Sequence, residues 1–335
     1  MSKKILQTIF FVLGLAVFGY LVYQLGWEQL VDSIQLVGWY WVPIILLALA
    51  WQACHTLAWH EVLTFFGHKV SFSNLFKLKM IAEAINMIVP SANLGGDTAR
   101  ASMIRKEVPL SGGIPSVMID KTLDYISKMF FNIIGFSIAI FYIDIPTAWF
   151  WGCVVYLSFI FIFYALLVWL QIKGLSGWLL TITRLIPPLR KALEKRRDQL
   201  QLLDTNLKEA YTKGSTRLFV AGLWHSLGRM LGMVEIWLVL WLLGASTSFV
   251  EVFFVAAVVN VVNGVFFLVP GQWGVAEGAQ LKLVELLGYG MTVGLSLGII
   301  RRIRRLLLVG VGLLILLFYD RGKEMVASKT NPTIQ

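Results

Sequence analysis

Apolar stretches of membrane-spanning length recur along this chain, and short segments between them carry most of its charges. The stretches lie at residues 5–24, 39–64, 112–143, 147–171, 216–243 and 290–319. A helix needs about 20 consecutive apolar residues to cross the hydrocarbon core of a bilayer. The pattern therefore predicts an all-α polytopic membrane protein with about six spanning helices.

The composition agrees with this class. Of the 335 residues, 58% are hydrophobic and only 14% are charged, which excludes a soluble globular domain. The two cysteines, Cys54 and Cys153, both lie in apolar stretches, and this fits neither a disulfide framework nor the spacing of metal ligands. Because no small-x-small cleavage site follows the first stretch, we expect an uncleaved span there rather than a signal peptide.

The distribution of lysine and arginine predicts which segments face the cytoplasm. Basic residues at both ends of the chain place both termini inside. The loop at 25–38 contains acids but no lysine or arginine and is predicted outside. Residues 173–217 hold ten Lys or Arg against four Asp or Glu, so they are predicted inside.

For this topology to hold, the segments 74–106 and 250–288 must each enter and leave on one face. Proline and glycine interrupt both beside charged residues. The interrupting residues and their charged neighbours are Pro90, Gly95, Gly96, Asp97 and Arg100 in the first, and Pro270, Gly271, Gly274 and Glu277 in the second. Broken backbone at membrane depth is tolerated only where protein buries it or water reaches it. We therefore expect two re-entrant helical hairpins with gating tips, the alternative being ordinary spans with proline kinks.

The hairpins divide this single membrane domain into two units with the same order of elements, which is span, span, hairpin, span. The units cover residues 1–143 and 147–320. They run in opposite directions, so the sequence predicts an inverted repeat. The spacing supports it, since Asp97 precedes Asp120 by 23 residues and Glu277 precedes Arg301 by 24.

Ionisable side chains inside spans are costly and are candidates for function. The candidate substrate-binding cations are Lys121, Lys128, Arg229, Arg301, Arg302, Arg304 and Arg305. The candidate ion-pair partners are Asp120, Asp124 and Glu235. A cluster of guanidinium groups suits a phosphate or a carboxylate. Two alternatives stay open: the two aspartates only neutralise two of the arginines and so tie the halves together, and Asp97 and Glu277 only cap the helices after the breaks.

The insert at 173–215 is the only soluble-looking part of the chain. Its leucines recur at helical spacing beside clustered arginines and lysines. This favours a basic amphipathic helix on the anionic inner leaflet. No nucleic-acid-binding module accompanies the charge, so a nucleic-acid partner is not expected.

Signatures of an enzyme are scarce. His55 and His60 are five residues apart, which is the wrong spacing for two zinc ligands on one helix. No glycine-rich phosphate loop and no nucleophile elbow is present in the sequence. We therefore expect no catalytic residue, no metal, no cofactor and no enzymatic activity.

The two broken segments carry a family resemblance. The string Pro-x-x-x-x-Gly-Gly-acid-x-x-Arg at 90–100 resembles the first signature of the flippase-like membrane domain of lysylphosphatidylglycerol synthases. The string at 270–277 resembles the second, and Asp120 with Lys121 also fits. The segment 224–237 is most similar to the hopanoid-associated branch. The chain departs from the family in having Asp97 where Glu is usual, and Gln272 or Trp273 where a second Gly is common.

The resemblance implies a lipid translocator in the inner membrane of a bacterial cell. Its substrate would be a phospholipid, hopanoid or polyprenyl-linked lipid whose anionic or polar head crosses a charged cavity between the repeats. The aminoacyl-transferring domain of full-length synthases does not follow the last span, so lysyl transfer is not expected.

Two other functions stay open. One is a membrane-embedded transferase acting on a lipid-linked substrate, with Asp120 and Asp124 as its only candidate metal-binding acids. The other is a scaffold subunit for lipid-synthesis enzymes. A homo-oligomer is compatible with any of these functions.

Overall fold

The computed structural model describes residues 27–88, 94–183, 187–266 and 275–330, and in this part of the chain it contains helices and no strand. The predicted all-α class is therefore confirmed. The predicted first span at 5–24 lies outside the described residues, as do Pro90, Pro270, Gly271 and Gly274.

Long helices occupy the other five predicted spans. They are α3 (Trp41–Phe65), α6 (Leu110–Ala139), α7 (Thr147–Lys173), α11 (Ser215–Leu242) and α14 (Met291–Thr330). Helices α6 and α7 begin directly after Pro109 and Pro146. Proline is tolerated at the start of a helix because the backbone N–H that it lacks would have no intrahelical partner there. A short helix, α2 (Trp27–Val37), and a 3-10 turn at Gly38–Tyr40 precede α3.

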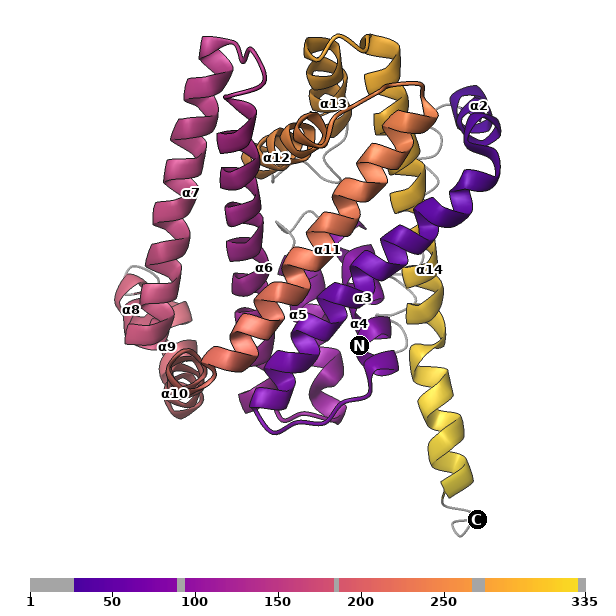
Figure 1. The fold of residues 1–335 in the computed structure, drawn as a ribbon. Coiled ribbons are helices and arrows are strands. Elements are labelled where there is room, and N and C mark those ends of the chain that lie inside the picture. The colour runs from indigo at the N-terminus through magenta and orange to yellow at the C-terminus, as the bar shows by residue number, and fades with distance from the viewer. Residues whose placement is uncertain (1–26, 89–93, 184–186, 267–274, 331–335) are drawn as a thin grey trace.

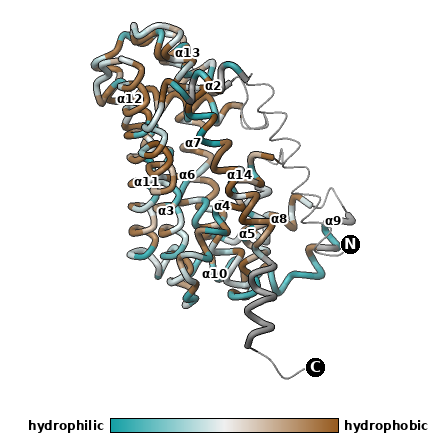
Figure 2. Tube along the Cα trace, turned by 90° about the vertical axis from the view of Figure 1, so that its right-hand side faces the viewer, coloured by the Kyte–Doolittle hydropathy of each residue, from teal (hydrophilic) through white to brown (hydrophobic). Residues whose placement is uncertain are grey.

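The outer surface of these helices is apolar. Helix α7 exposes Val155, Phe159, Ile162 and Trp169 along its length, and Figure 2 shows many hydrophobic residues along α12 and the upper part of α14. Among the described residues, the stretches 35–65 and 147–173 are long and apolar enough to cross a membrane. An apolar exterior around buried charged residues is the arrangement expected of a helix bundle in lipid.

Two helical hairpins occupy the interrupted segments. The first consists of α4 (Phe72–Ile88) and α5 (Leu94–Met103), followed by a 3-10 turn at Ile104–Lys106. The second consists of α12 (Phe249–Val265) and α13 (Val275–Leu286). Hydrogen bonds join the two ends of each hairpin: Asn74 Nδ2 donates to Glu107 Oε1 at 2.7 Å, and the Tyr289 hydroxyl donates to the Ser246 carbonyl at 3.1 Å. Each hairpin therefore returns to the place where it began.

The helices pack in a pattern that links the two halves of the chain. Helix α3 lies along α11 in the middle of the bundle, α4 packs on α14, and α12 packs on α6. Figure 1 shows α12 and α13 near the upper end and α4 and α5 lower down behind α3 and α11. The largest apolar core joins α6, α7, α11, α12 and α14, with Phe254 fully buried in it.

The insert forms three helices at the lower end of the bundle (Figure 1), α8 (Leu175–Ile182), α9 (Pro187–Glu194) and α10 (Arg197–Lys213). The apolar face of α10 does not point to a lipid leaflet, because its Leu207 and Ala210 are fully buried against the α3 and α6 side chains Ala58 and Ile119. The Tyr211 hydroxyl donates to Gln171 Oε1 of α7 at 2.6 Å, and burial raises the pKa of Tyr211 to about 12. Helix α10 is thus docked on the protein itself, and the contact of the basic insert 173–215 with the inner leaflet stays a prediction.

Candidate functional site

Asp120 lies at the centre of a buried network of charges. Its carboxylate is 1% exposed and accepts from Lys79 Nζ at 2.8 Å and from Arg100 Nη1 at 2.6 Å. His225 Nε2 lies 3.1 Å from the other oxygen. These partners come from α4, α5 and α11, so one carboxylate of α6 ties three other helices together.

A second acid, Asp97 in the first turn of α5, extends the network. Arg100, one turn further along α5, donates from Nε to Asp97 Oδ1 at 3.0 Å. Lys121 of α6 lies 3.0 Å from the other oxygen of Asp97. The Arg100 guanidinium also stacks 4.7 Å from the centre of the Trp59 ring, so a cation–π contact adds to its two ion pairs.

The first hairpin brings Asp97 to this position through a close contact between its own helices. Asn86 Oδ1 of α4 accepts from the Gly96 backbone N–H at 2.7 Å. A Cβ at Gly96 would collide with the Ala82 carbonyl of α4. Glycine is therefore required there, because any side chain would push α5 away from α4.

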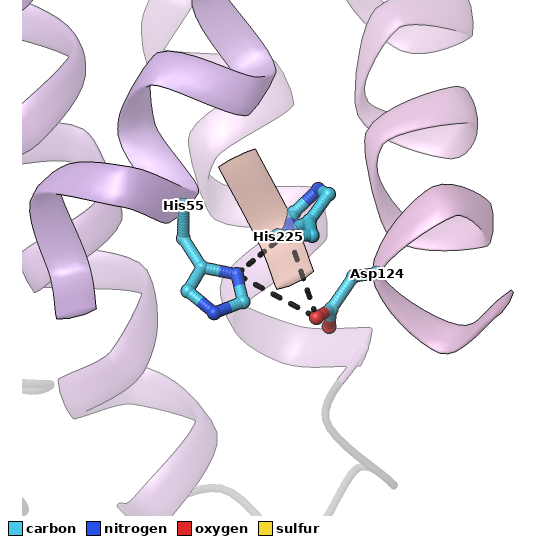
Figure 3. A group of neighbouring side chains, drawn as sticks. All are labelled: His55, Asp124 and His225. Atoms are coloured by element: carbon cyan, nitrogen blue, oxygen red, sulfur yellow. Dashed lines mark hydrogen bonds and ion pairs between the residues drawn. The ribbon is translucent and has the colours of Figure 1, made fainter. Parts of the chain in front are cut away.

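On the other side of Asp120, two histidines meet where α3 crosses α11. His55 Nδ1 and His225 Nδ1 are 2.7 Å apart, and Asp124 Oδ1 lies 3.5 Å and 3.7 Å from these two nitrogens (Figure 3). Asp124 is one helical turn beyond Asp120 on α6, and Arg229 Nη2 donates to its Oδ1 at 2.5 Å. A Cβ at Gly228 would lie 3.0 Å from the His55 ring, so the missing side chain lets the two helices approach closely.

A cavity of about 90 Å³ lies beside this network and has room for water-sized groups. The charged residues that line it are the bases Lys79, Arg100 and Lys121 and the acids Glu83, Asp97, Asp120 and Asp124. Arg229, paired with Asp124, brings the bases to four against four acids. The cavity is thus highly charged yet close to electrically balanced.

A separate group of charges joins α11, α13 and α14. Glu235 of α11 is 1% exposed and accepts from Arg304 Nη1 at 2.7 Å, with Arg301 Nε 3.7 Å away. Glu277 in the first turn of α13 pairs with Arg302. These three arginines of α14 thus pair with acids of α11 and α13.

The structure therefore divides the residues selected from the sequence between two groups. The first group surrounds the cavity and comprises Asp97, Arg100, Asp120, Lys121, Asp124 and Arg229. The second group joins the arginines Arg301, Arg302 and Arg304 of α14 to Glu235 of α11 and Glu277 of α13. Lys128 lies one turn beyond Asp124, and Arg305 lies beside Arg304. The alternative in which the aspartates neutralise arginines between the halves applies to Asp124, which pairs with Arg229 of the second half. Asp120 instead pairs with Lys79 and Arg100 of the first half.

Three members of the cavity network do not belong to the site expected from the sequence: Lys79, His55 and His225. Lys79 lies early in the first hairpin yet reaches Asp120, and Arg100, expected at the tip of that hairpin, is 2% exposed. His55 and His225 are 170 residues apart and on different helices. A buried histidine in an otherwise apolar span was the signal that could have identified them.

His55, Asp124 and His225 are also a group whose donor atoms lie within 4.8 Å of one another, as in a metal site. Two nitrogens bound to one tetrahedral zinc ion would be about 3.3 Å apart, given Zn–N bonds of about 2.0–2.1 Å. The observed 2.7 Å is a hydrogen-bond distance, and Arg229 already occupies the nearest oxygen of Asp124. The geometry fits a proton between the rings better than a metal ion.

Comparisons with known proteins agree with the resemblance in the two interrupted segments. Residues 6–312 match the lysylphosphatidylglycerol synthase TM region. A UPF0104 membrane protein of Methanocaldococcus jannaschii is 25% identical over 291 residues, which cover 82% of each chain. Another UPF0104 membrane protein, from Methanothermobacter thermautotrophicus, is 20% identical over 309 residues, 88% of this chain and 90% of the relative. No solved structure matches the chain. Because the family match spans nearly the whole sequence, the chain belongs to the lysylphosphatidylglycerol synthase TM region family.

Proposed function

We propose that this protein is a lipid translocator that moves an anionic or polar lipid head group through the charged cavity while the tails stay in the bilayer. The observation that carries the proposal is the cavity itself. Eight ionisable side chains, seven of them acids or bases other than histidine, line a space of about 90 Å³ inside a helix bundle with an apolar exterior. Such groups are costly at membrane depth, and in membrane proteins they mark substrate and ion pathways.

The arrangement of the hairpins supports an inverted repeat around this cavity. Asp97 in the first turn of α5 pairs with Lys121 of α6, and Glu277 in the first turn of α13 pairs with Arg302 of α14. The two ion pairs thus occupy the same position in each half. Likewise, α4 packs on the last helix of the second half and α12 on the last helix of the first. In transporters built from inverted repeats, the substrate site lies near the junction of the halves.

Lys121 is the cation that we expect an anionic head group to engage first. Its side chain is 21% exposed, whereas those of Arg100 and Asp120 are 2% and 1% exposed. Its partner Asp97 is also more accessible than Asp120, with 13% of its side chain exposed. An entering phosphate or carboxylate could therefore replace Asp97 at Lys121 and leave the buried Arg100–Asp120 pair intact.

We further propose that the lower end of the bundle in Figure 1 faces the cytoplasm of the cell membrane. Helix α10 and the C-terminal end of α14 both lie at that end. It carries the basic insert, and segments rich in lysine and arginine stay on the cytoplasmic side. In this orientation the first hairpin would enter from the cytoplasm and the second from outside.

A transferase is less well supported than a translocator. The oxygens of Asp120 and Asp124 that a catalytic metal would need already accept hydrogen bonds from Lys79, Arg100 and Arg229. Three cations around two carboxylates oppose the binding of a divalent ion. We therefore propose a protein without a catalytic step.

The proposal is tested by reconstituting the purified protein into vesicles that contain head-labelled phospholipid, hopanoid or polyprenyl-linked lipid. A membrane-impermeant quencher then reports how fast each lipid leaves the outer leaflet. We expect the protein to accelerate the movement of at least one of these lipids over protein-free vesicles. Equal rates with and without protein for all three lipid classes would refute it.

A further inference from the structure

The contact between His55 and His225 is not explained by packing or by the binding of a head group. Both rings are buried, at 6% and 0% exposure, and they lie at the junction of α3 and α11. Their Nδ1 atoms are 2.7 Å apart, so one nitrogen must donate a proton and the other must accept it. The pair is therefore a hydrogen-bonded unit with a defined number of protons.

Asp120 determines which nitrogen donates. This carboxylate is held in its ionised form by Lys79 and Arg100, so it can only accept a hydrogen bond from His225 Nε2. In a neutral His225 the proton is then on Nε2, and Nδ1 is left to accept. His55 must donate from Nδ1, and its own lone pair is on Nε2.

This remaining lone pair is where an additional proton can bind. Among the described residues, no group forms a hydrogen bond to His55 Nε2, although the residue is buried and lines the cavity. An unpartnered acceptor inside a protein is costly, and this nitrogen is the one in the pair that is left to bind a proton. The two rings would keep their mutual hydrogen bond in both forms.

The surrounding charges link this proton to an anion. The charged groups around the pair and its cavity are Lys79 and Glu83 of α4, Asp97 and Arg100 of α5, Asp120, Lys121 and Asp124 of α6, and Arg229 of α11. They comprise four bases and four acids, so a proton on the histidines gives the group an excess of positive charge. An anionic head group beside Lys121 would remove that excess, so the proton and the head group would each favour the binding of the other.

We propose that the His55–His225 pair is a proton-binding site that couples the movement of the lipid head group to the movement of one proton. The inference rests on the proposed function. His55 Nε2 accepts one proton from cavity water as the anionic head group enters, which gives a singly charged histidine pair. The same proton returns to water when the head group leaves on the other side, so that one proton crosses with each head group.

The first test measures the protonation of the pair directly, without transport. The chain has four histidines, so protein labelled with ¹⁵N-histidine gives few resonances in a nitrogen-15 NMR spectrum. We expect His55 and His225 to show coupled nitrogens that share one proton and titrate together, and to take up a proton more readily when a short-chain anionic phospholipid is added. The variant His225→Gln should lose the coupling, whereas His60→Gln, five residues further along α3, should keep it.

Three outcomes of this spectrum would overturn the inference. The two histidines could titrate independently of each other. They could stay neutral at every pH at which the protein is folded, with and without the phospholipid. Added zinc could also shift both resonances at one equivalent, which would make the pair part of a metal site.

The second test measures coupling in the vesicle assay, with a pH dye inside the vesicles. In the wild-type protein, a pH gradient should change the rate of lipid movement according to its direction, and lipid movement should carry protons. His55→Gln should lose both responses in whatever lipid movement it retains, and His60→Gln should behave as the wild type. Lipid movement that ignores the gradient and carries no proton would overturn the coupling and leave the proposed function standing. No lipid movement at all would refute the proposed function and the coupling together, while the spectrum still decides whether the pair binds a proton.

Discussion

At the scale of single residues, Asp120 connects more elements than any other described acid of the network. It accepts from Lys79 of α4, Arg100 of α5 and His225 of α11. Buried charges are tolerated only when their partners satisfy them, and removing one partner leaves an uncompensated charge inside the protein. The network therefore stabilises the folded protein and also forms part of the cavity wall.

We predict that Asp120→Asn destabilises the protein by about 3–5 kcal/mol, because it leaves Lys79 and Arg100 with one buried negative charge fewer. Asp144→Asn, at an exposed turn, is the matched control and should be nearly neutral. Denaturant unfolding in detergent measures both. Equal stability of the two variants would mean that Asp120 does not hold the network together.

At this scale, spacing along the chain identifies only neighbours on the same helix. The pairing of Asp97 with Arg100 follows from their spacing of three residues, since such positions share a helix face. The contacts of Asp120 with Lys79 and His225 span 41 and 105 residues. They depend on how helices cross, and no local spacing carries that information.

At the scale of elements, the first hairpin depends on the close approach of α4 and α5 at Gly96. We predict that Gly96→Ala costs about 1–3 kcal/mol, because its Cβ collides with the Ala82 carbonyl and moves Asp97 away from Lys121. Gly152→Ala on α7 is the control, since a Cβ there meets nothing within 4 Å. The midpoint of thermal unfolding reports both changes, and an unaltered Gly96→Ala midpoint would contradict this packing.

The docking of α10 on the bundle gives a second prediction at this scale. Leu207 is fully buried, whereas Leu202 on the same helix is 47% exposed. We expect Leu207→Ala to cost about 2–5 kcal/mol through lost burial and a cavity. Leu202→Ala should cost far less if α10 packs on the protein, as its contacts show. The reverse order of the two losses, measured by denaturant unfolding, would place the apolar face of α10 against lipid instead.

Element positions were largely predictable because apolar periodicity and proline or glycine breaks act locally. The stretch at 147–171 became α7 (Thr147–Lys173), and 216–243 became α11 (Ser215–Leu242). The last helix runs on to Thr330, beyond the apolar stretch. The insert was predicted to lie on a leaflet because periodicity reveals an apolar face but not what covers it.

At the scale of the whole molecule, each hairpin begins and ends together, and this makes the topology testable. We predict that single cysteines at Asn74 and Glu107 react with an impermeant thiol reagent from the cytoplasmic side. Cysteines at Ser246 and Tyr289 should react from the opposite side. The background would lack Cys54 and Cys153, which are both buried. Labelling of positions 74 and 107 from opposite sides would contradict a re-entrant hairpin.

The central claim is that a lipid head group passes Lys121 in the charged cavity, and the vesicle assay with two matched lysine variants tests it most directly. Lys121→Gln removes a charge-assisted contact worth about 1.5–3 kcal/mol, so the rate of lipid movement should fall about ten- to hundredfold. Lys282→Gln removes a 59% exposed lysine that does not line the cavity and should leave the rate unchanged. A folded Lys121→Gln protein that moves lipid as fast as the Lys282→Gln protein would contradict the account.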